Sequence, residues 1–212
     1  MDDVINIVHY DIYGNITNPQ DRKELLYLCD KYNIRETDKV LPIAVEYADT
    51  KMVELLLKSG ANVEAVNTKK QGSTSLMIAS RLGLVKMVIL LLKYGANIET
   101  RDCCGSKALH YASRHGRDDV VRLLLNPQID GVAGAHVNAR NFNRHTPLHY
   151  ALRRSHNVKV VASLLEYGAD MNIKNHNNKT FLELGNNIGY IKEVIDQHLL
   201  RNNGSNIKPA KR

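Results

Sequence analysis

Histidine and cysteine are the residue types of this sequence most suited to metal binding or catalysis. A zinc site needs closely spaced ligands, such as His-x-x-x-His with a third partner. Cys103 and Cys104 are adjacent, and no second cysteine pair completes such a site. The sequence also contains no phosphate loop, nucleotide fingerprint or nucleophile elbow, so we predict no metal, no cofactor and no catalytic centre. Ligand spacing is also missing from the histidines His9, His136, His156, His176 and His198.

The composition is typical of a soluble, folded chain. Of its 212 residues, 43% are hydrophobic and 24% are charged, close to the averages for globular proteins. No apolar run approaches the roughly 18 residues of a membrane span. The acidic start, Met1-Asp2-Asp3, is unlike a signal peptide, and three cysteines fit a reducing compartment better than a disulfide framework. We therefore expect an intracellular, cytoplasmic protein with no membrane contact.

The positive charge is concentrated at one end of the chain. The formal net charge is +7, and Arg201, Lys208, Lys211 and Arg212 all lie in the last segment, 201–212. The folded body is therefore only mildly basic, which makes global charge a weak argument for nucleic-acid binding. Because segment 201–212 is polar and basic, we predict that it is a disordered tail.

Two phrases recur in phase along the chain. The first, Leu-Leu-Leu-Lys-x-Gly-Ala-Asn, stands at 55–62 and 90–97, with a close variant at 163–170. The second reads Lys-Ala-Leu-His-Tyr-Ala at 107–112 and Thr-Pro-Leu-His-Tyr-Ala at 146–151. A period of 34 to 39 residues between the glycines of the first phrase indicates stacked repeats, because one such unit cannot bury its apolar faces alone. These glycines are Gly60, Gly95, Gly134 and Gly168.

Both phrases resemble the consensus of the ankyrin-repeat family, which carries Thr-Pro-Leu-His-x-Ala, then Val-Val-x-Leu-Leu-Leu, then Gly-Ala. The resemblance covers about residues 37–200. It implies an all-α solenoid of stacked helix-turn-helix units, joined by extended finger turns and closed by degenerate capping repeats. It also implies that His110 and His149 connect neighbouring repeats by hydrogen bonds.

Local chemistry supports the same architecture. Thr146 can cap free N–H groups at a helix start, and Pro147 follows where its missing N–H costs nothing. The small Ala151 allows a neighbouring helix to approach closely. The apolar stripe of a second helix consists of Val120, Val121, Leu123, Leu124 and Leu125. The glycines Gly95, Gly134 and Gly168 suit the left-handed conformation that ends a helix.

These patterns predict seven segments, with an exposed loop where the third full repeat is about six residues longer than usual. The segments are a degenerate N-terminal capping repeat at 1–36, ankyrin repeats at 37–67, 68–101, 102–140 (with the inserted loop at 126–133) and 141–173, a C-terminal capping repeat at 174–200, and the tail at 201–212.

By resemblance to the family, the fingers and the exposed edge of the inner helices line a concave face that touches partners. Arg81, Arg114, Arg153 and Arg154 fall at equivalent places in successive repeats and predict a basic ladder with about one rung per repeat. Two alternatives stay open: the arginines are solvated surface residues, and Phe142 packs under a neighbouring finger. The full set of predicted partner-binding residues is Lys69, Lys70, Arg81, Arg114, His115, Phe142, His145, Arg153 and Arg154.

The leading functional hypothesis is a non-catalytic, monomeric adaptor that binds an acidic or phosphorylated segment of another protein, because arginine pairs with both anions. A nucleic-acid-binding protein is the alternative, although base-stacking aromatics are scarce. A third hypothesis is an enzyme, or a regulator of one, that acts through the loop at 126–133. The abundance of Asn, Ile and Lys suggests a large DNA virus or an intracellular bacterium, in which case the protein acts on host proteins in the host cytoplasm or nucleus.

Overall fold

The computed structural model describes residues 37–58, 60–67, 71–152, 157–184 and 189–204, together with Lys23 and Tyr27. The predicted N-terminal cap, apart from those two residues, and the tail beyond Gly204 lie outside this part of the chain. The described elements are α3 (Thr37–Glu46), α4 (Thr50–Lys58), β1 (Val66–Asn67), β2 (Ser73–Thr74), α5 (Ser75–Leu82), α6 (Val85–Lys93), α7 (Ala108–Arg114), α8 (Asp118–Leu125), α9 (Pro147–Ala151), α10 (Val158–Glu166), α11 (Phe181–Leu184) and α12 (Gly189–Gly204).

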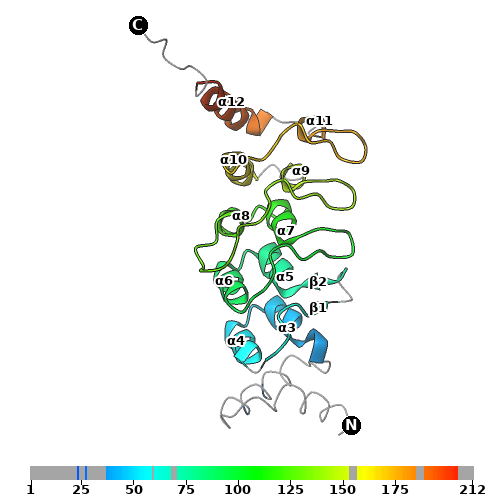
Figure 1. Cartoon of the computed structure of the whole chain (residues 1–212), viewed down its shortest axis with the longest axis vertical. Coiled ribbons are helices and arrows are strands. Elements are labelled where there is room, and N and C mark those ends of the chain that lie inside the picture. The colour runs from blue at the N-terminus through cyan, green and yellow to red at the C-terminus, as the bar shows by residue number, and fades with distance from the viewer. Residues whose placement is uncertain are drawn as a thin grey trace.

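The helices form two parallel columns, which confirms the predicted all-α solenoid. Figure 1 shows α3, α5, α7, α9 and α11 stacked in the inner column, and α4, α6, α8, α10 and α12 in the outer one. Extended fingers project from the inner column on the side away from the outer helices. The first finger contains a short antiparallel pairing, Val66 with Thr74 and Asn67 with Ser73. The fingers and the inner helices together form the surface discussed below.

A continuous apolar core fills the space between the two columns. It contains the leucines and valines of the recurring phrases, such as Leu109, Val120 and Leu124, each at most 1% exposed. The inner helices approach one another through Ala79, Ala112 and Ala151, which are fully buried. Burial of apolar surface stabilises the folded chain by roughly 25 cal/mol per Å². Because a single repeat cannot bury both of its apolar faces, only the stack of repeats is stable.

Hydrogen bonds from a backbone N–H of one repeat to a side chain of the preceding repeat hold the stack in register on the side of the outer turns. The acceptors occupy the same slot in three successive repeats. Glu64 accepts from the Asn97 N–H at 2.8 Å, Glu99 from the His136 N–H at 3.1 Å, and Asn138 from the Asp170 N–H at 2.9 Å. This series was not predicted, although the acceptors stand at one repeated slot, two residues after Asn62, Asn97 and His136.

The inserted segment 126–133 leaves the stack at the end of α8 and returns to it. Ile129 and Val132 are half-buried and pack against the core, while Gln128 and Asp130 are exposed. The Ala135 N–H donates to the Leu124 carbonyl at 2.8 Å, the same bond that Ala96 and Ala169 make in the repeats without an insertion. The insertion therefore adds a loop without shifting the following finger.

One backbone prediction at this loop is wrong. Gly95 and Gly168 have φ of +85°, as predicted for a helix end, but Gly134 is not among the residues with positive φ. Gly134 is instead needed for close approach, because a Cβ there would lie 2.1 Å from the Leu125 carbonyl oxygen. The longer loop has moved the left-handed position to Gly131, with φ of +76°.

The C-terminal helix is longer than predicted. α12 continues past Leu200 to Gly204, so the first residues of segment 201–212 are helical and not part of an extended tail. Among the described residues, no helix is both long and apolar enough to cross a membrane.

Candidate protein-binding surface

An Asx side chain closes the turn of each finger after the first. In the three fingers that follow the first, Oδ1 of Asp102, Asn141 or Asn175 accepts the backbone N–H four residues later, at 2.8 to 3.0 Å. Neighbouring fingers are also joined backbone to backbone. The Cys103 N–H donates to the Gln71 carbonyl, that of Phe142 to the Cys104 carbonyl, and that of His176 to the Asn143 carbonyl, at 3.0 to 3.1 Å.

His110 connects its own helix start to the next finger, as the family resemblance implies. Its Nδ1 accepts the Lys107 N–H at 3.1 Å, and Nε2 lies 3.1 Å from the Ala139 carbonyl and 3.2 Å from that of His145. These partners assign the proton to Nε2. Burial disfavours the imidazolium and lowers the pKa of His110 to about 4, so the ring is neutral at physiological pH.

His149 repeats this arrangement one unit later. It forms a capping box with Thr146 at the start of α9, in which Nδ1 accepts the Thr146 N–H at 3.2 Å. Nε2 lies 3.3 Å from the Lys179 carbonyl of the next finger. Burial lowers the pKa of His149 as well. Both histidines therefore have structural roles, in agreement with the family resemblance.

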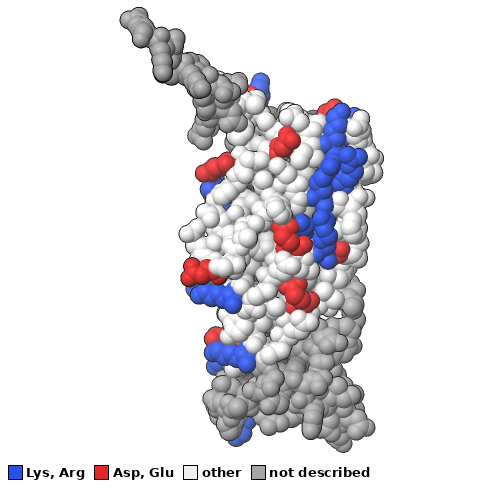
Figure 2. All heavy atoms as spheres, in the orientation of Figure 1, with Lys and Arg blue, Asp and Glu red and all other residues white. Residues whose placement is uncertain are grey.

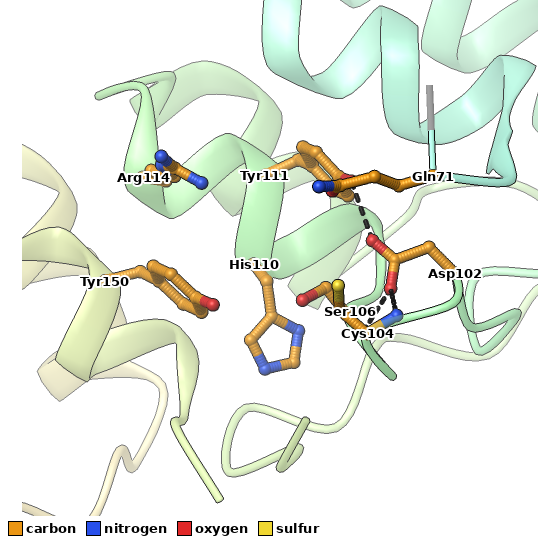
Figure 3. Close-up of a pocket in the computed structure, with 8 residues that line it drawn as sticks. All are labelled: Gln71, Asp102, Cys104, Ser106, His110, Tyr111, Arg114 and Tyr150. Atoms are coloured by element: carbon orange, nitrogen blue, oxygen red, sulfur yellow. Dashed lines mark hydrogen bonds between the residues drawn. The ribbon is translucent and has the colours of Figure 1, made fainter. Parts of the chain in front are cut away.

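A pocket of about 140 Å³ lies between α7, α9 and the fingers. Figure 3 shows Arg114 and Tyr150 on one side of it and Asp102 on the other. The Asp102 carboxylate is engaged by the Cys104 and Ser106 N–H groups, each at 2.8 Å, and by the Tyr111 hydroxyl at 2.7 Å. Burial, opposed by a hydrogen bond with Ser73 and reinforced by Asp102, raises the pKa of Tyr111 to about 12. Asp102 and Tyr111 are thus fixed parts of the wall.

Arg114 is the cation of this pocket that has no carboxylate partner among the described residues. It is exposed in the last turn of α7, and its guanidinium carbon lies 5.9 Å from the centroid of the Tyr150 ring. Cation–π contact of this kind orients a guanidinium without neutralising it. The Tyr150 hydroxyl is fixed in turn by the Asn141 amide, which donates to it at 2.9 Å.

The other predicted arginines are placed differently. Arg81 lies in the last turn of α5, but its Nη2 is 3.6 Å from Glu46 Oε1, so its charge is partly compensated. α9 ends at Ala151, before the two arginines that would supply the next rungs. Arg153 and Arg154 lie outside the described residues, as do Lys69 and Lys70, so the basic ladder through these positions stays a prediction.

The two predicted histidines of the surface are half-buried. His115 is the residue that ends α7. The His145 ring lies 3.1 Å, at Nε2, from the Asn175 side-chain amide, and it contacts the His149 and His176 rings edge to face at centroid distances of 5.6 and 5.8 Å. His145 is therefore held between fingers and offers a partner only part of its ring.

Phe142 was predicted either to bind a partner or to pack under a neighbouring finger, and its position is compatible with both. The ring packs on the neighbouring finger, where a Cβ added to Gly105 would lie 2.7 Å from Cδ1 of Phe142. The side chain is nevertheless 68% exposed. An aromatic ring held in place on one side and open to solvent on the other is a suitable anchor for a partner, because it loses little conformational entropy on binding.

Arg144 was not predicted as a functional residue. Its backbone conformation, with a positive φ, now indicates that it is one. It occupies the turn position that Gly105 takes in the preceding finger, with φ of +58° compared with +74° for the glycine. A side chain in this conformation costs about 1–2 kcal/mol. Backbone strain of this kind concentrates at functional positions, and a departure from glycine in the finger turn was the available signal.

We expect Arg144→Gly to raise the free energy of unfolding by up to about 1 kcal/mol, because relief of the strain exceeds the added freedom of the unfolded chain. Urea unfolding followed by circular dichroism measures this. Asn178, with φ of +58° in the same turn position of the next finger, provides the control. Asparagine tolerates that conformation better than arginine does, so Asn178→Gly should gain less; an equal gain would show that Arg144 is not specially strained.

A second group of basic residues was also missed. Arg101, Arg140 and Lys174 each stand immediately before the Asx residue that closes a finger turn, in three successive repeats. We call this row the basic stripe. All three side chains are exposed. The signal was present in the sequence as a basic residue at one repeated slot, but this slot precedes the Asx residue, whereas the predicted partner-binding residues of these fingers follow it.

Comparison with known proteins identifies the class. The family model described as ankyrin repeats (3 copies) matches residues 16–102 and 97–175, which is most of the chain, and the phrases and stacked helices agree with it. The chain belongs to the ankyrin-repeat family. Repeats of this family generally bind other proteins and are generally non-catalytic.

Individual relatives come from a virus, a bacterium and a fungus. An ankyrin repeat protein of fowlpox virus is 33% identical over 153 residues, covering 72% of this chain and 43% of the relative. One of Rickettsia bellii is 36% identical over 66 residues, 31% of this chain and 25% of that protein. A palmitoyltransferase of Lachancea kluyveri is 38% identical over 88 residues, 41% of this chain and 11% of the enzyme. The chain thus spans less than half the length of each of these relatives.

Proposed function

We propose that this protein is a non-catalytic adaptor that acts as a monomer and binds an acidic or phosphorylated segment of another protein on its concave face. Arg114 is the observation that carries the proposal. Its exposed guanidinium stands at a pocket, is oriented by the Tyr150 ring, and makes no salt bridge or hydrogen bond with other described residues. A carboxylate or phosphate group would complete its hydrogen bonding.

Phe142 supports the same surface, because an exposed aromatic residue near an arginine is a frequent composition at the centre of protein interfaces. The viral and bacterial relatives support the further proposal that the partner is a host protein, met in the host cytoplasm. The fixed roles of His110 and His149 in the scaffold, together with the engaged Asp102 carboxylate, support a binding role over a catalytic one.

The test compares the native chain with Arg114→Glu in affinity capture from host-cell extract, followed by titration of the captured proteins' acidic segments as synthetic peptides, with and without phosphate. Hydrogen bonds to charged groups contribute about 1.5–3 kcal/mol, so the charge reversal should weaken peptide binding at least about tenfold. Added salt should weaken binding of the native chain.

Lys159→Glu is the matched control, since Lys159 is exposed on the outer helix α10 and undergoes the same change of charge. It should leave binding unchanged, and both variants should retain the circular dichroism of the native chain. If Arg114→Glu and Lys159→Glu bind the peptides as well as the native chain, the concave pocket is not the binding site. If the chain prefers oligonucleotides to every peptide, the adaptor proposal is wrong.

A further inference from the structure

The basic stripe of Arg101, Arg140 and Lys174 is continuous across three repeats. Arg101 Nη1 donates to the Arg140 carbonyl at 2.8 Å, and Arg140 Nη2 donates to the Lys174 carbonyl, also at 2.8 Å. Each residue of the row therefore touches the next. Figure 2 shows Lys and Arg side chains forming one band along the finger side of the upper repeats, with acidic side chains beside it at its two ends.

The charges of the stripe are not paired in salt bridges within the described part of the chain. Arg101, Arg140 and Lys174 form no salt bridge there, whereas the nearby Glu99 is paired with Lys107. Lys174 acts on one nearby acid: the pKa of Glu183 is lowered mainly by hydrogen bonds from Thr180 and, to a smaller extent, by the charges of Lys179 and Lys174. An anion placed on the stripe would experience the same attraction.

The two arginines are positioned before any partner arrives. The Arg101 guanidinium donates to the Gly105 carbonyl at 2.9 Å as well as to Arg140, so its orientation is fixed by two backbone groups. A guanidinium has five N–H donors, which leaves several of them for a carboxylate. Because the side chain is already ordered, binding costs less conformational entropy than it would for a free arginine.

The spacing of the stripe selects a conformation in the partner. Neighbouring packed helices lie about 8–10 Å apart, and each rung of the stripe belongs to one repeat. A polyproline II helix has three residues per turn and rises about 3.1 Å per residue, so every third side chain lies on one face at a separation of about 9 Å. In an α-helix, residues three apart share a face but are only about 4.5 Å apart along the axis. In a β-strand, side chains on one face are two residues and about 7 Å apart, so neither conformation places every third side chain on one face at about 9 Å.

We propose that the basic stripe binds an extended, polyproline II-type segment of a partner protein that carries Asp or Glu at every third residue. The stripe shares no residue with the pocket at Arg114, so the inference goes beyond the proposed function and does not depend on it. Three repeats with one basic rung each fit three successive acidic residues of such a segment.

Synthetic peptides of identical composition test the spacing directly. Each contains proline, alanine and three glutamates, with the glutamates at every third position in one peptide, at every second in another and adjacent in a third. Binding to the full chain is measured by fluorescence anisotropy at low and physiological salt. We expect the every-third peptide to bind about tenfold more tightly than the adjacent one. Equal affinity for all three peptides, or no detectable binding at low salt, would overturn the proposal.

Variants then locate the binding surface. Lys174→Glu should weaken binding of the every-third peptide about fivefold or more, through loss of one pair and an added repulsion. The Lys174 side chain is exposed and makes no hydrogen bond with other described residues. Lys93→Glu, exposed on the outer helix α6, changes charge equally and should have no effect. Equal losses in both variants would show non-specific attraction, and tighter binding of an oligothymidine than of any peptide would identify the stripe as a nucleic-acid surface; either result overturns the proposal.

Failure of the stripe proposal can be told apart from failure of the adaptor proposal, because each variant should affect only one of the two binding assays. Arg114→Glu should leave the every-third peptide bound if the stripe acts alone, and Lys174→Glu should leave capture through the pocket largely intact. Loss of peptide binding in Arg114→Glu but not in Lys174→Glu would assign the peptide to the pocket and refute the stripe.

Discussion

Replacing Gly134 with alanine should destabilise this protein strongly. The added Cβ would lie 2.1 Å from the Leu125 carbonyl oxygen and 3.0 Å from its carbon. Both are backbone atoms at the end of α8, so relief requires movement of the helix end or of the inserted loop. We expect the free energy of unfolding to fall by about 3 kcal/mol, the upper range for overpacked sites. This corresponds to a decrease in Tm of roughly 6–12 °C for a chain of this size.

Gly95→Ala is the matched control for that experiment. Gly95 stands at the corresponding position of the preceding repeat, where an added Cβ would have nothing within 4 Å, but where φ is +85°. In Gly95→Ala the free energy of unfolding should fall only by the cost of placing an alanine in the left-handed conformation, about 1–2 kcal/mol. Thermal and urea unfolding of the two variants compares the cost of a steric clash at position 134 with the cost of a positive φ at position 95. If Gly95→Ala is the more damaging change, close approach at Gly134 is not the dominant constraint.

Acidification should destabilise the stack through His110. The folded pKa is about 4, compared with 6.5 for an ordinary histidine, so between these values the unfolded chain binds more protons than the folded one. Stability therefore rises with pH across this window and is lost as pH falls from about 6.5 to about 4. A difference of this size corresponds to about 3 kcal/mol, and His149, whose pKa is also lowered, acts in the same direction.

Urea unfolding at several values of pH between 4 and 7 measures this effect. His110→Ala should be less stable than the native chain at pH 7, because the Lys107 N–H and two carbonyls lose their partner. Its stability should change less with pH over the window. His176→Ala, which removes an exposed ring, should keep the pH dependence of the native chain. An unchanged slope in His110→Ala would mean that another group causes acid sensitivity.

The fold was predictable because its determinants are local and repeated. The phrase at 146–151 contains a helix start and an inter-repeat histidine within six consecutive residues, and both have the predicted role. The pairing of Thr146 with His149 in a capping box was not predicted. Periodicity then fixes which faces must be buried. Gly134 shows the limit of this reasoning, since a glycine in the expected slot serves close approach and the left-handed residue is Gly131, a change that only the path of the longer loop decides.

The binding surface was predicted less completely, because it depends on relations between repeats. Arg81 fits the sequence pattern of a basic rung, but Glu46 from the preceding repeat compensates it, and no local pattern announces that contact. Arg114 was identified from its slot, while its orientation comes from Tyr150 of the next repeat. Arg101 and Arg140 form a row through backbone carbonyls of neighbouring units, which spacing along one repeat does not reveal.

The hydrogen bonds that join each finger to the next also bear on how such a chain evolves. The donors and acceptors at Cys103, Phe142 and His176 are backbone groups, so any repeat with the same turn can stand beside any other. Duplication or loss of one whole repeat would keep every remaining junction intact. The length of the array can therefore change in steps of one unit. For the extended segment proposed to bind the basic stripe, each step would add or remove one turn of about three residues.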